Sequence, residues 1–371
     1  MTRVLVRGAA DQLGDLITAS TGVLPGTALA DKARAAMASL SAGSTAGACT
    51  QLGEYLDLVR AQAGRKIPAA TAAALIADAH PDPGGACLLR HGGVMTESNE
   101  RAELGETVAR LRDAVYQDGI ASVPGAFARA WGEALLEDFE TLFAEARSRP
   151  DGTVNRGTNR FYFTVHPERL RGFVDLVTHP VVAALSAEVL GPDWRVVEVA
   201  FDVPLPESRY QPWHRDFPMP DATRDERRLT SLAFNLTAVD VTPEMGPFEI
   251  APGTHWDDGS QFDHEMFPTT SQTERYDGLR QPRMPRLGDM SVRSGLTIHR
   301  GTPNRSATAR PVLILGVIAP EVDPGPHGLQ LSTDYAATLP PELLGHLHAS
   351  VVSELQPLVQ SHTIEGLVMG D

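Results

Sequence analysis

Residues 194–203 read WRVVEVAFDV and are the first of five short β-type runs that decide the fold. The others are TSLAFNLTAV at 230–239, PFEIAP at 247–252, MSVRSGLTIH at 290–299 and PVLILGVIAP at 311–320. Proline, glycine and aspartate separate the runs, and no long helical pattern lies between them. Short strands at such spacing predict an antiparallel barrel or jelly roll. We therefore expect an α+β protein with a jelly-roll core over about residues 194–320.

Helical patterns precede the β-type region in two blocks. In the first block, apolar residues between Leu52 and Val59 recur at i, i+3, i+4 and i+7, which indicates an amphipathic helix. In the second block, a similar stripe runs from Leu104 to Val115. We therefore expect a helical N-terminal extension at residues 1–103 and a second domain at residues 104–371. The extension offers helix faces through which two copies of the chain could form a homodimer.

Two further segments have a weaker pattern. The stretch between His255 and Met290 is polar and almost patternless, and long segments of this kind are commonly functional lids. Near the C-terminus, apolar residues from Leu344 to Leu355 recur with a helical period. We expect a lid in the first segment and a helix in the second.

Composition restricts the class of partner. The formal net charge of −15 argues against nucleic acid, because that affinity is built largely from Lys and Arg on phosphates. Two cysteines, Cys49 and Cys87, are too few for a disulfide framework and fit a reducing compartment. No apolar stretch resembles a signal peptide or approaches the length of a membrane span. We expect a cytoplasmic protein that acts on a small molecule, without a nucleic-acid or membrane partner.

The pattern His-x-Asp/Glu occurs more often than composition predicts. With 12 His and 47 acidic residues in 371, chance gives about one to two matches. The chain has four, at His80/Asp82, His166/Glu168, His214/Asp216 and His255/Asp257. Only the pair His214 and Asp216 follows a β run between aromatic residues, in RYQPWHRDF. Residues at i and i+2 of a strand point to the same face, where both can hold one metal ion.

A third ligand is expected from another strand. His299 ends the run MSVRSGLTIH. Two imidazoles and one carboxylate on one face leave three coordination positions open, which is the facial triad of non-haem iron(II) oxygenases. In such a site 2-oxoglutarate takes two positions and O₂ takes the third. The pattern therefore predicts an iron(II) site of His214, Asp216 and His299.

Arg310 is the candidate partner for the distal carboxylate of 2-oxoglutarate. That carboxylate needs a fixed cation, preferably a bidentate one. Lysine occurs only at Lys32 and Lys66, so the cation must be an arginine. Arg310 follows His299 by 11 residues, across HRGTPNRSATAR, and opens the next strand. A strand-turn-strand return would bring it back beside His299.

These motifs together resemble the phytanoyl-CoA dioxygenase family of iron(II)/2-oxoglutarate oxygenases. The matching elements are DGIASVPG at 118–125, QPWHRD at 211–216, GPFEIAPGTH at 246–255, GD at 288–289, and the spacing His299-x4-Asn304-x-Ser306-x3-Arg310. The resemblance covers about residues 105–320, and its last pattern is specific. Residues before 105 have no counterpart in the family pattern.

The resemblance implies a double-stranded β-helix core and a complete active site. It implies iron(II) on His214, Asp216 and His299, with Arg310 on 2-oxoglutarate. Gln211 and Asn235 are candidates for further contacts to 2-oxoglutarate. The implied activity is a dioxygenase reaction that hydroxylates, desaturates or cyclises a small molecule of specialised metabolism.

The residues that would contact substrate are less well marked. The segment NRGTNRFYF at 155–163 places Arg156, Arg160 and Tyr162 before the barrel, where they would form a pocket wall, and Arg160 and Tyr162 are the candidates for substrate contact. Two other hypotheses about the function stay open. One is a cupin-type metal enzyme that does not use 2-oxoglutarate, which the Arg310 spacing disfavours. The other is a non-catalytic jelly-roll binding protein, which the intact set of metal ligands disfavours.

Overall fold

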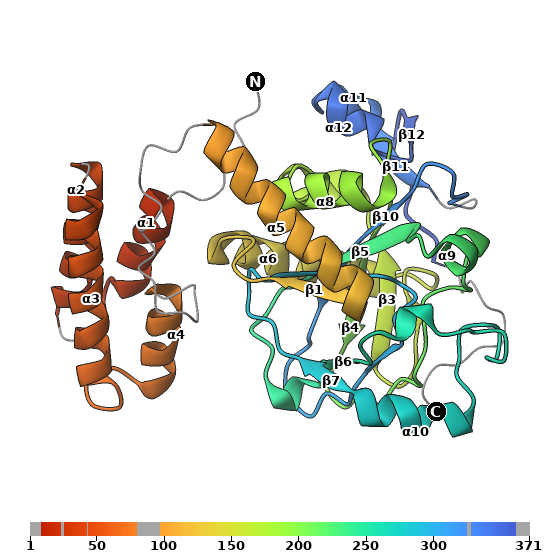
Figure 1. Cartoon of the computed structure of the whole chain (residues 1–371), viewed down its shortest axis with the longest axis horizontal. Coiled ribbons are helices and arrows are strands. Elements are labelled where there is room, and N and C mark those ends of the chain that lie inside the picture. Colours follow the sequence, from red (N-terminus) through yellow and green to blue (C-terminus); the bar gives the residue numbers. More distant parts are fainter. Residues whose placement is uncertain (1–8, 24–25, 43, 80–96, 325–327, 361–371) are drawn as a thin grey trace. The chain divides into compact units, whose positions relative to one another are not determined.

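The structure is a computed structural model that describes residues 9–23, 26–42, 44–79, 97–324 and 328–360 (Figure 1). The chain divides into two compact units, Met1–Gly105 and Glu106–Asp371. Cys87 and the pair His80/Asp82 lie outside the described residues. Within the described part of the chain, no helix has the length and apolarity needed to cross a membrane.

The N-terminal unit is helical, as the amphipathic pattern predicts. Its helices are α1 (Ala9–Ser20), α2 (Ala28–Ser41), α3 (Thr45–Gln62) and α4 (Ala69–Ala79). Tyr55 of α3 is fully buried, and its hydroxyl is 2.8 Å from the hydroxyl of Ser20 in α1. Buried apolar side chains from all four helices form one core, including Leu13, Leu16, Leu29, Leu52, Leu56, Val59 and Leu75. The expectation of a helical N-terminal extension is therefore confirmed.

The second unit is built on antiparallel sheets. The larger sheet has the order β1-β8-β5-β10-β4-β3-β2 and the smaller one has the order β7-β6-β9. The strands of the larger sheet are β1 (Ile120–Val123), β2 (Val154–Asn155), β3 (Arg160–Thr164), β4 (Arg195–Pro204), β5 (Ser231–Thr237), β8 (Met290–Arg293) and β10 (Val312–Ile318). Those of the smaller sheet are β6 (Phe248–Ile250), β7 (Gln281–Arg283) and β9 (His299–Gly301). All pairings in these two sheets are antiparallel, which confirms the jelly-roll expectation.

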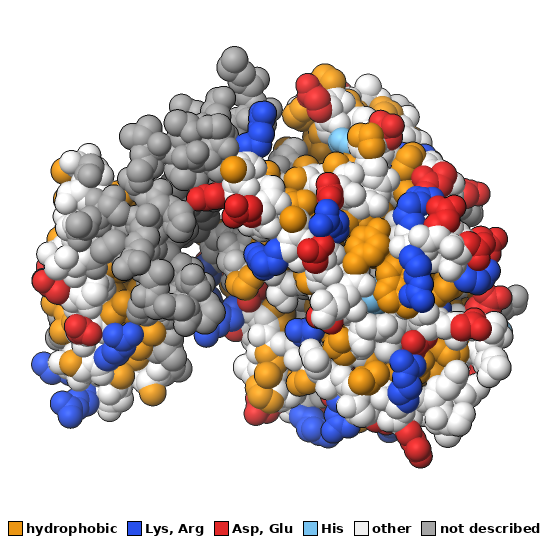
Figure 2. All heavy atoms as spheres, in the orientation of Figure 1, with side chains coloured by type: hydrophobic (Ala, Val, Ile, Leu, Met, Phe, Trp, Pro, Cys, Tyr) orange, Lys and Arg blue, Asp and Glu red, His pale blue; other side chains and the backbone are white. Residues whose placement is uncertain are grey.

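Helices surround these sheets (Figure 1). The longer ones are α5 (Glu97–Asp118), α6 (Arg129–Arg147), α8 (Pro180–Leu190) and α10 (Thr270–Leu279). The shorter ones are α7 (Phe173–Val177), α9 (Asp221–Glu226), α11 (Thr333–Ala336) and α12 (Pro341–Gly345), with 3-10 turns at Pro167–Arg169, Pro243–Met245 and Thr254–Trp256. On the face shown in Figure 2, acidic and basic side chains are interspersed.

Strand β3 shows how the larger sheet separates a core face from a cavity face. Phe161 and Phe163 point to one side, where they meet Phe143 of α6 with ring centroids 6.0 and 5.6 Å apart. Arg160 and Tyr162 alternate with them and line a cavity on the other side. Successive side chains of a strand point to opposite faces, so the aromatic residues that hold α6 also fix the direction of the polar ones.

Two segments differ from the sequence-based expectation. The segment from 256 to 285 is not a patternless loop, because it forms α10 and β7. Tyr276 of α10 is 1% exposed and packs in a cluster with Trp213, Phe262 and Ile298. A capping box at Thr269 starts this helix. The helix and strand were not predicted because isolated aromatic residues, spaced widely along the chain, give no periodic signal, and the expected role of the segment as a lid stays a prediction.

The prediction of a helix from Leu344 to Leu355 is also wrong. Helix α12 ends at Gly345, and residues 349–352 form strand β12 (Ala349–Val352), which pairs in parallel with β11 (Leu329–Ser332). Val351 and Val352 are β-branched and suit a strand. The spacing of four apolar residues carries no information about β11, the strand with which this segment pairs.

The Gly288-Asp289 motif has a structural role. Gly288 has a φ of +94°, and a Cβ there would overlap the carbonyl oxygen of Phe127. The backbone N–H of Phe127 in turn donates to the Gly288 carbonyl at 2.9 Å. The Asp289 carboxylate accepts from the backbone N–H groups of Gly125 and Arg286, both at 2.8 Å. The motif therefore ties the segment after β1 to the start of β8.

We predict that Gly288→Ala lowers the free energy of unfolding by about 2 kcal/mol or more, because it adds both backbone strain and a steric overlap. Gly278→Ala is the matched control. Gly278 lies in helix α10, and a Cβ there meets nothing within 4 Å. The control should be neutral or stabilising by up to about 1 kcal/mol. Chemical denaturation measures both values. Equal values for the two variants would show that the turn at 288 is not constrained.

Candidate metal centre

A cavity of about 850 Å³ lies between the inner faces of the two sheets. Its wall includes polar side chains from β3, β4, β5, β8 and β9, as well as Gln211, His214 and Asp216. The sequence-predicted site residues all line this cavity, namely Arg160, Tyr162, Gln211, His214, Asp216, Asn235, His299 and Arg310. The volume lies within the range typical of sites for small molecules.

His214, Asp216 and His299 lie together in this cavity. Their candidate ligand atoms are all within 4.8 Å of one another. His214 and His299 form an antiparallel backbone pair, in which each N–H donates to the other's carbonyl oxygen, at 3.0 and 2.9 Å. The backbone N–H of Asp216 donates to the carbonyl of Gly295 at 2.8 Å. Backbone pairing therefore brings His299 next to Asp216, which lies 83 positions earlier in the sequence.

The two imidazoles are oriented for metal binding. In each ring Nδ1 lies 2.8 Å from a carbonyl oxygen, that of Pro212 for His214 and that of Thr297 for His299. A carbonyl only accepts, so Nδ1 carries the proton and Nε2 is left with a free lone pair. Burial, with the nearby His299, lowers the pKa of His214 to about 3. His214 is therefore neutral, as a metal ligand must be.

The distance from His299 to Asp216 is itself informative. His299 Nε2 lies 3.3 Å from Asp216 Oδ1. Two acceptor atoms at this distance repel each other unless a proton or a cation lies between them. The group can hold a metal ion with two nitrogen ligands and one oxygen ligand.

Arg293 is a further residue of the site, and the sequence analysis missed it. Its guanidinium is buried in β8 and donates to Asp216 Oδ2 at 2.6 Å. Desolvation acts to raise the pKa of Asp216, but the charge of Arg293 and its hydrogen bond outweigh that effect and hold the pKa well below its ordinary value. Arg293 thus keeps the carboxylate ionised and leaves Oδ1 toward the histidines. The only signal in the sequence was one charge inside the run MSVRSG.

Arg310 and Arg160 form a second group of charges. Arg160 is 1% exposed and pairs with Asp202 at 3.0 Å. Arg310 is 3% exposed, and its Nε has no hydrogen-bond partner among the described residues. Burial and the charge of Arg160 lower the pKa of Arg310 to about 10. A buried guanidinium in this situation favours a bound carboxylate.

The expected hairpin between His299 and Arg310 does not form. Strands β9 and β10 belong to different sheets, and the backbone N–H of Arg310 donates to Pro204 of β4. Asn304 and Ser306 shape the connection between the sheets. Asn304 Oδ1 accepts from the N–H and hydroxyl of Ser306, and Asn304 Nδ2 donates to the carbonyls of Pro204 and Thr308. The spacing motif therefore encodes a crossover that delivers Arg310 to the cavity.

The side chains of Gln211 and Asn235 differ in what they contact. Gln211 Oε1 accepts from the backbone N–H of Gly301 at 2.9 Å, and Gln211 N donates back to the Gly301 carbonyl. The amide oxygen of Gln211 therefore supports β9. Asn235 lies in the middle of β5, paired with Ile314 and Ser291, and its side chain faces the cavity.

The other described His-x-acid pairs do not form such a group. His255 is fully buried, and its Nε2 donates to the carbonyl of Tyr116 at 3.0 Å. Burial lowers the pKa of His255 to about 4. His166 Nε2 lies 2.8 Å from the carbonyl oxygen of Gln356. Both histidines hold backbone segments together.

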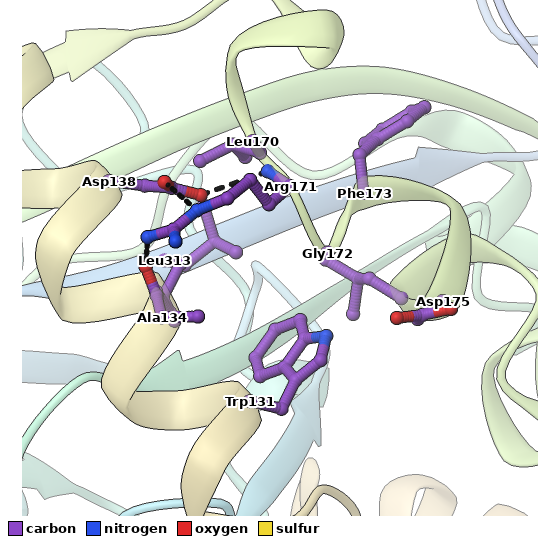
Figure 3. Close-up of a pocket in the computed structure, with 11 residues that line it drawn as sticks. Trp131, Ala134, Asp138, Leu170, Arg171, Gly172, Phe173, Asp175 and Leu313 are labelled. Atoms are coloured by element: carbon purple, nitrogen blue, oxygen red, sulfur yellow. Dashed lines mark hydrogen bonds and ion pairs between the residues drawn. The ribbon is translucent and has the colours of Figure 1, made fainter.

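A second, smaller cavity of about 210 Å³ lies between α6 and the segment around Gly172 (Figure 3). Trp131, Leu170 and Phe173 form its apolar wall. Arg171 stands at its edge, where it donates to the Asp138 carboxylate and the Ala134 carbonyl. The wall of this smaller cavity contains none of the candidate metal ligands.

Comparison with known proteins identifies the family. The family model for phytanoyl-CoA dioxygenase (PhyH) matches residues 115–312, which is more than half of the chain. The chain therefore belongs to the phytanoyl-CoA dioxygenase family and is an oxidoreductase. This confirms the resemblance found in the sequence.

Three solved structures of enzymes are among those similar to this chain. The α-ketoglutarate-dependent carbocyclase SnoK from nogalamycin biosynthesis is 18% identical, with a TM-score of 0.46, 57% of this chain covered and 83% of SnoK covered. The epimerase SnoN, in complex with Fe³⁺, α-ketoglutarate and nogalamycin RO, is 20% identical, with a TM-score of 0.46 and coverages of 71% and 98%. EctD from S. alaskensis with bound Fe is 16% identical, with a TM-score of 0.45 and coverages of 57% and 76%.

We predict that Arg293→Gln weakens Fe(II) binding by about 10- to 100-fold, because Asp216 loses the group that holds its orientation and charge. Arg293→Lys should restore part of the affinity. Arg283→Gln is the control, since Arg283 lines the same cavity but its guanidinium donates to Gln281. Anaerobic titration calorimetry measures the affinities. Unchanged affinity in Arg293→Gln would show that the ion pair does not support the metal group.

Proposed function

We propose that this protein is an iron(II)- and 2-oxoglutarate-dependent dioxygenase that hydroxylates, desaturates or cyclises a small molecule. One observation carries the proposal. A His–Asp–His group lines the same cavity as Arg310, a buried arginine that pairs with no carboxylate of the described residues, in a member of the phytanoyl-CoA dioxygenase family. The first feature suits iron(II), and the second suits the distal end of 2-oxoglutarate.

The donor set fits iron(II). Two neutral imidazole nitrogens and one carboxylate oxygen are the ligands of the facial triad, which leaves coordination positions for other molecules. His214, Asp216 and His299 would hold the metal. The close approach of His299 Nε2 to Asp216 Oδ1 supports this assignment, because a cation between these atoms would remove the repulsion of two acceptors. A structural zinc site would instead close the coordination shell with four protein ligands.

The charges beyond the triad fit 2-oxoglutarate. Arg310 would hold the distal carboxylate, and its fork of N–H donors matches both carboxylate oxygens. Asn235 lies on the same cavity wall and can donate a further hydrogen bond. When bound, iron(II), 2-oxoglutarate and O₂ supply the oxidising chemistry, with succinate and CO₂ as the products of the cosubstrate.

The chain's own residues position the reactants and exclude water. Arg293 fixes Asp216, and the two carbonyl contacts at Nδ1 fix the imidazoles. Ile120, Phe217 and Ile314 give the cavity an apolar wall that can hold the carbon body of a substrate. Such a wall lowers the local dielectric and strengthens the polar contacts beside it.

Removing a histidine of the triad should abolish turnover. We predict that His214→Ala and His299→Ala each lose stoichiometric iron(II) and all iron-dependent succinate formation, with circular dichroism unchanged. His255→Ala is the matched control because His255 also belongs to a His-x-Asp pair. It should keep one iron per chain while losing stability, since its bond to Tyr116 is lost. Full activity in either triad variant would remove that residue from the site.

Arg310 should govern the 2-oxoglutarate requirement. We predict that Arg310→Ala raises the KM for 2-oxoglutarate by about 30-fold or more, since losing the partner of a buried carboxylate costs roughly 2–5 kcal/mol. Arg305→Ala, which alters an exposed residue five positions earlier, should change it little. The rate of succinate release at varied concentrations of 2-oxoglutarate gives the KM of both variants. The reverse order of effects would contradict the assignment, and iron binding without any succinate would favour a metal enzyme that does not use 2-oxoglutarate.

A further inference from the structure

The arginines that line the cavity differ in what they contact. They are Arg156, Arg160, Arg283, Arg293 and Arg310. Arg160 and Arg293 pair with Asp202 and Asp216, and Arg283 donates to Gln281. The proposed function assigns Arg310 to 2-oxoglutarate. For the guanidinium of Arg156, no hydrogen bond or ion pair to another described residue is observed, so this cation is available to a ligand.

Arg156 is held in place although no ion pair joins its guanidinium to another described residue. Its guanidinium stacks on the ring of Tyr162 at 4.3 Å from the centroid. The Tyr162 hydroxyl donates to the carboxylate of Glu198 on β4. Glu198 in turn lies over Gly316, where a Cβ would come within 2.7 Å of its carboxylate oxygen. The absence of a side chain at 316 therefore makes room for Glu198, and the three residues form a fixed polar platform on the cavity wall.

The platform and the His–Asp–His cluster belong to the wall of the same cavity. Burial raises the pKa of Glu198, and Arg156 opposes that rise. A ligand anchored on Arg156 would thus have its body between this wall and the two histidines.

The charge balance of the cavity favours an additional anion. Among the described residues that line it, five guanidinium groups face four carboxylates, those of Glu198, Asp202, Asp216 and Asp323. Iron(II) and 2-oxoglutarate cancel each other in charge, so the loaded site keeps an excess of one positive charge. A monoanionic substrate would balance this excess of positive charge.

We propose that the substrate is a free carboxylic acid with an apolar body, whose carboxylate binds Arg156 on the platform formed with Tyr162 and Glu198. This inference rests on the proposed function. A guanidinium stacked on an aromatic ring presents its N–H fork in a fixed plane, which suits the two oxygens of a carboxylate. Acyl thioesters and esters lack this group at the acyl end and would leave Arg156 without a partner.

The test uses the full-length iron(II) enzyme and substrate-stimulated succinate release. The probes are phenylacetic, 3-phenylpropionic and octanoic acids and N-acetyl-L-leucine, each beside its methyl ester. We expect one or more acids to stimulate succinate release over the basal rate and their esters to fail. Arg156→Gln should raise the KM for a stimulating acid by about 10- to 100-fold, and Arg156→Lys should restore part of it. Arg305→Gln, at an exposed position, should behave as the unmodified enzyme.

Two outcomes would overturn the inference while leaving the proposed function intact. One is basal iron-dependent succinate release that no acid stimulates, or that esters stimulate as well as acids do. The other is a loss of 2-oxoglutarate affinity in Arg156→Gln, measured anaerobically from the visible absorption of the iron complex, which would assign Arg156 to the cosubstrate. Complete absence of iron-dependent succinate release in the unmodified enzyme would instead contradict the proposed function itself.

Discussion

Two backbone hydrogen bonds between His214 and His299 hold the candidate site together. They join the segment 211–216 to β9, and further bonds from Gln211 to Gly301 and from Asp216 to Gly295 extend the contact in both directions. Because this pairing is antiparallel, a slip of one residue would turn the side chains away from each other. The cluster of His214, Asp216 and His299 therefore depends on the register of this pairing. The turn motifs around the two sheets help to keep that register.

Charge pairing is the second constraint on the cavity. Asp216 is held by Arg293 and Asp202 by Arg160, so the cavity wall carries charges whose orientation is fixed before any ligand binds. Preorganised charges of this kind need little rearrangement on binding. The apolar outer face of the same strands, with Phe161 and Phe163 against α6, supplies the packing that holds them.

The sequence predicted the antiparallel core and the three side chains that cluster as His214, Asp216 and His299, because strand runs and the spacing His214-x-Asp216 are local signals. It did not predict Arg293 as the partner of Asp216, since that contact depends on where β8 lies in the sheet. It also placed β9 and β10 in one hairpin, whereas the chain crosses between sheets there. Tyr276 and the pairing of β12 were missed for the same reason, as their partners are distant in sequence.

The most direct test of the central claim is anomalous X-ray diffraction at the iron edge, from crystals loaded anaerobically with Fe(II) and 2-oxoglutarate. The account predicts one iron peak bound by Nε2 of His214, Nε2 of His299 and the carboxylate of Asp216, with the distal carboxylate of 2-oxoglutarate on Arg310. An iron peak at any other group of residues, or a 2-oxoglutarate whose distal carboxylate lies on Arg156 instead, would contradict it.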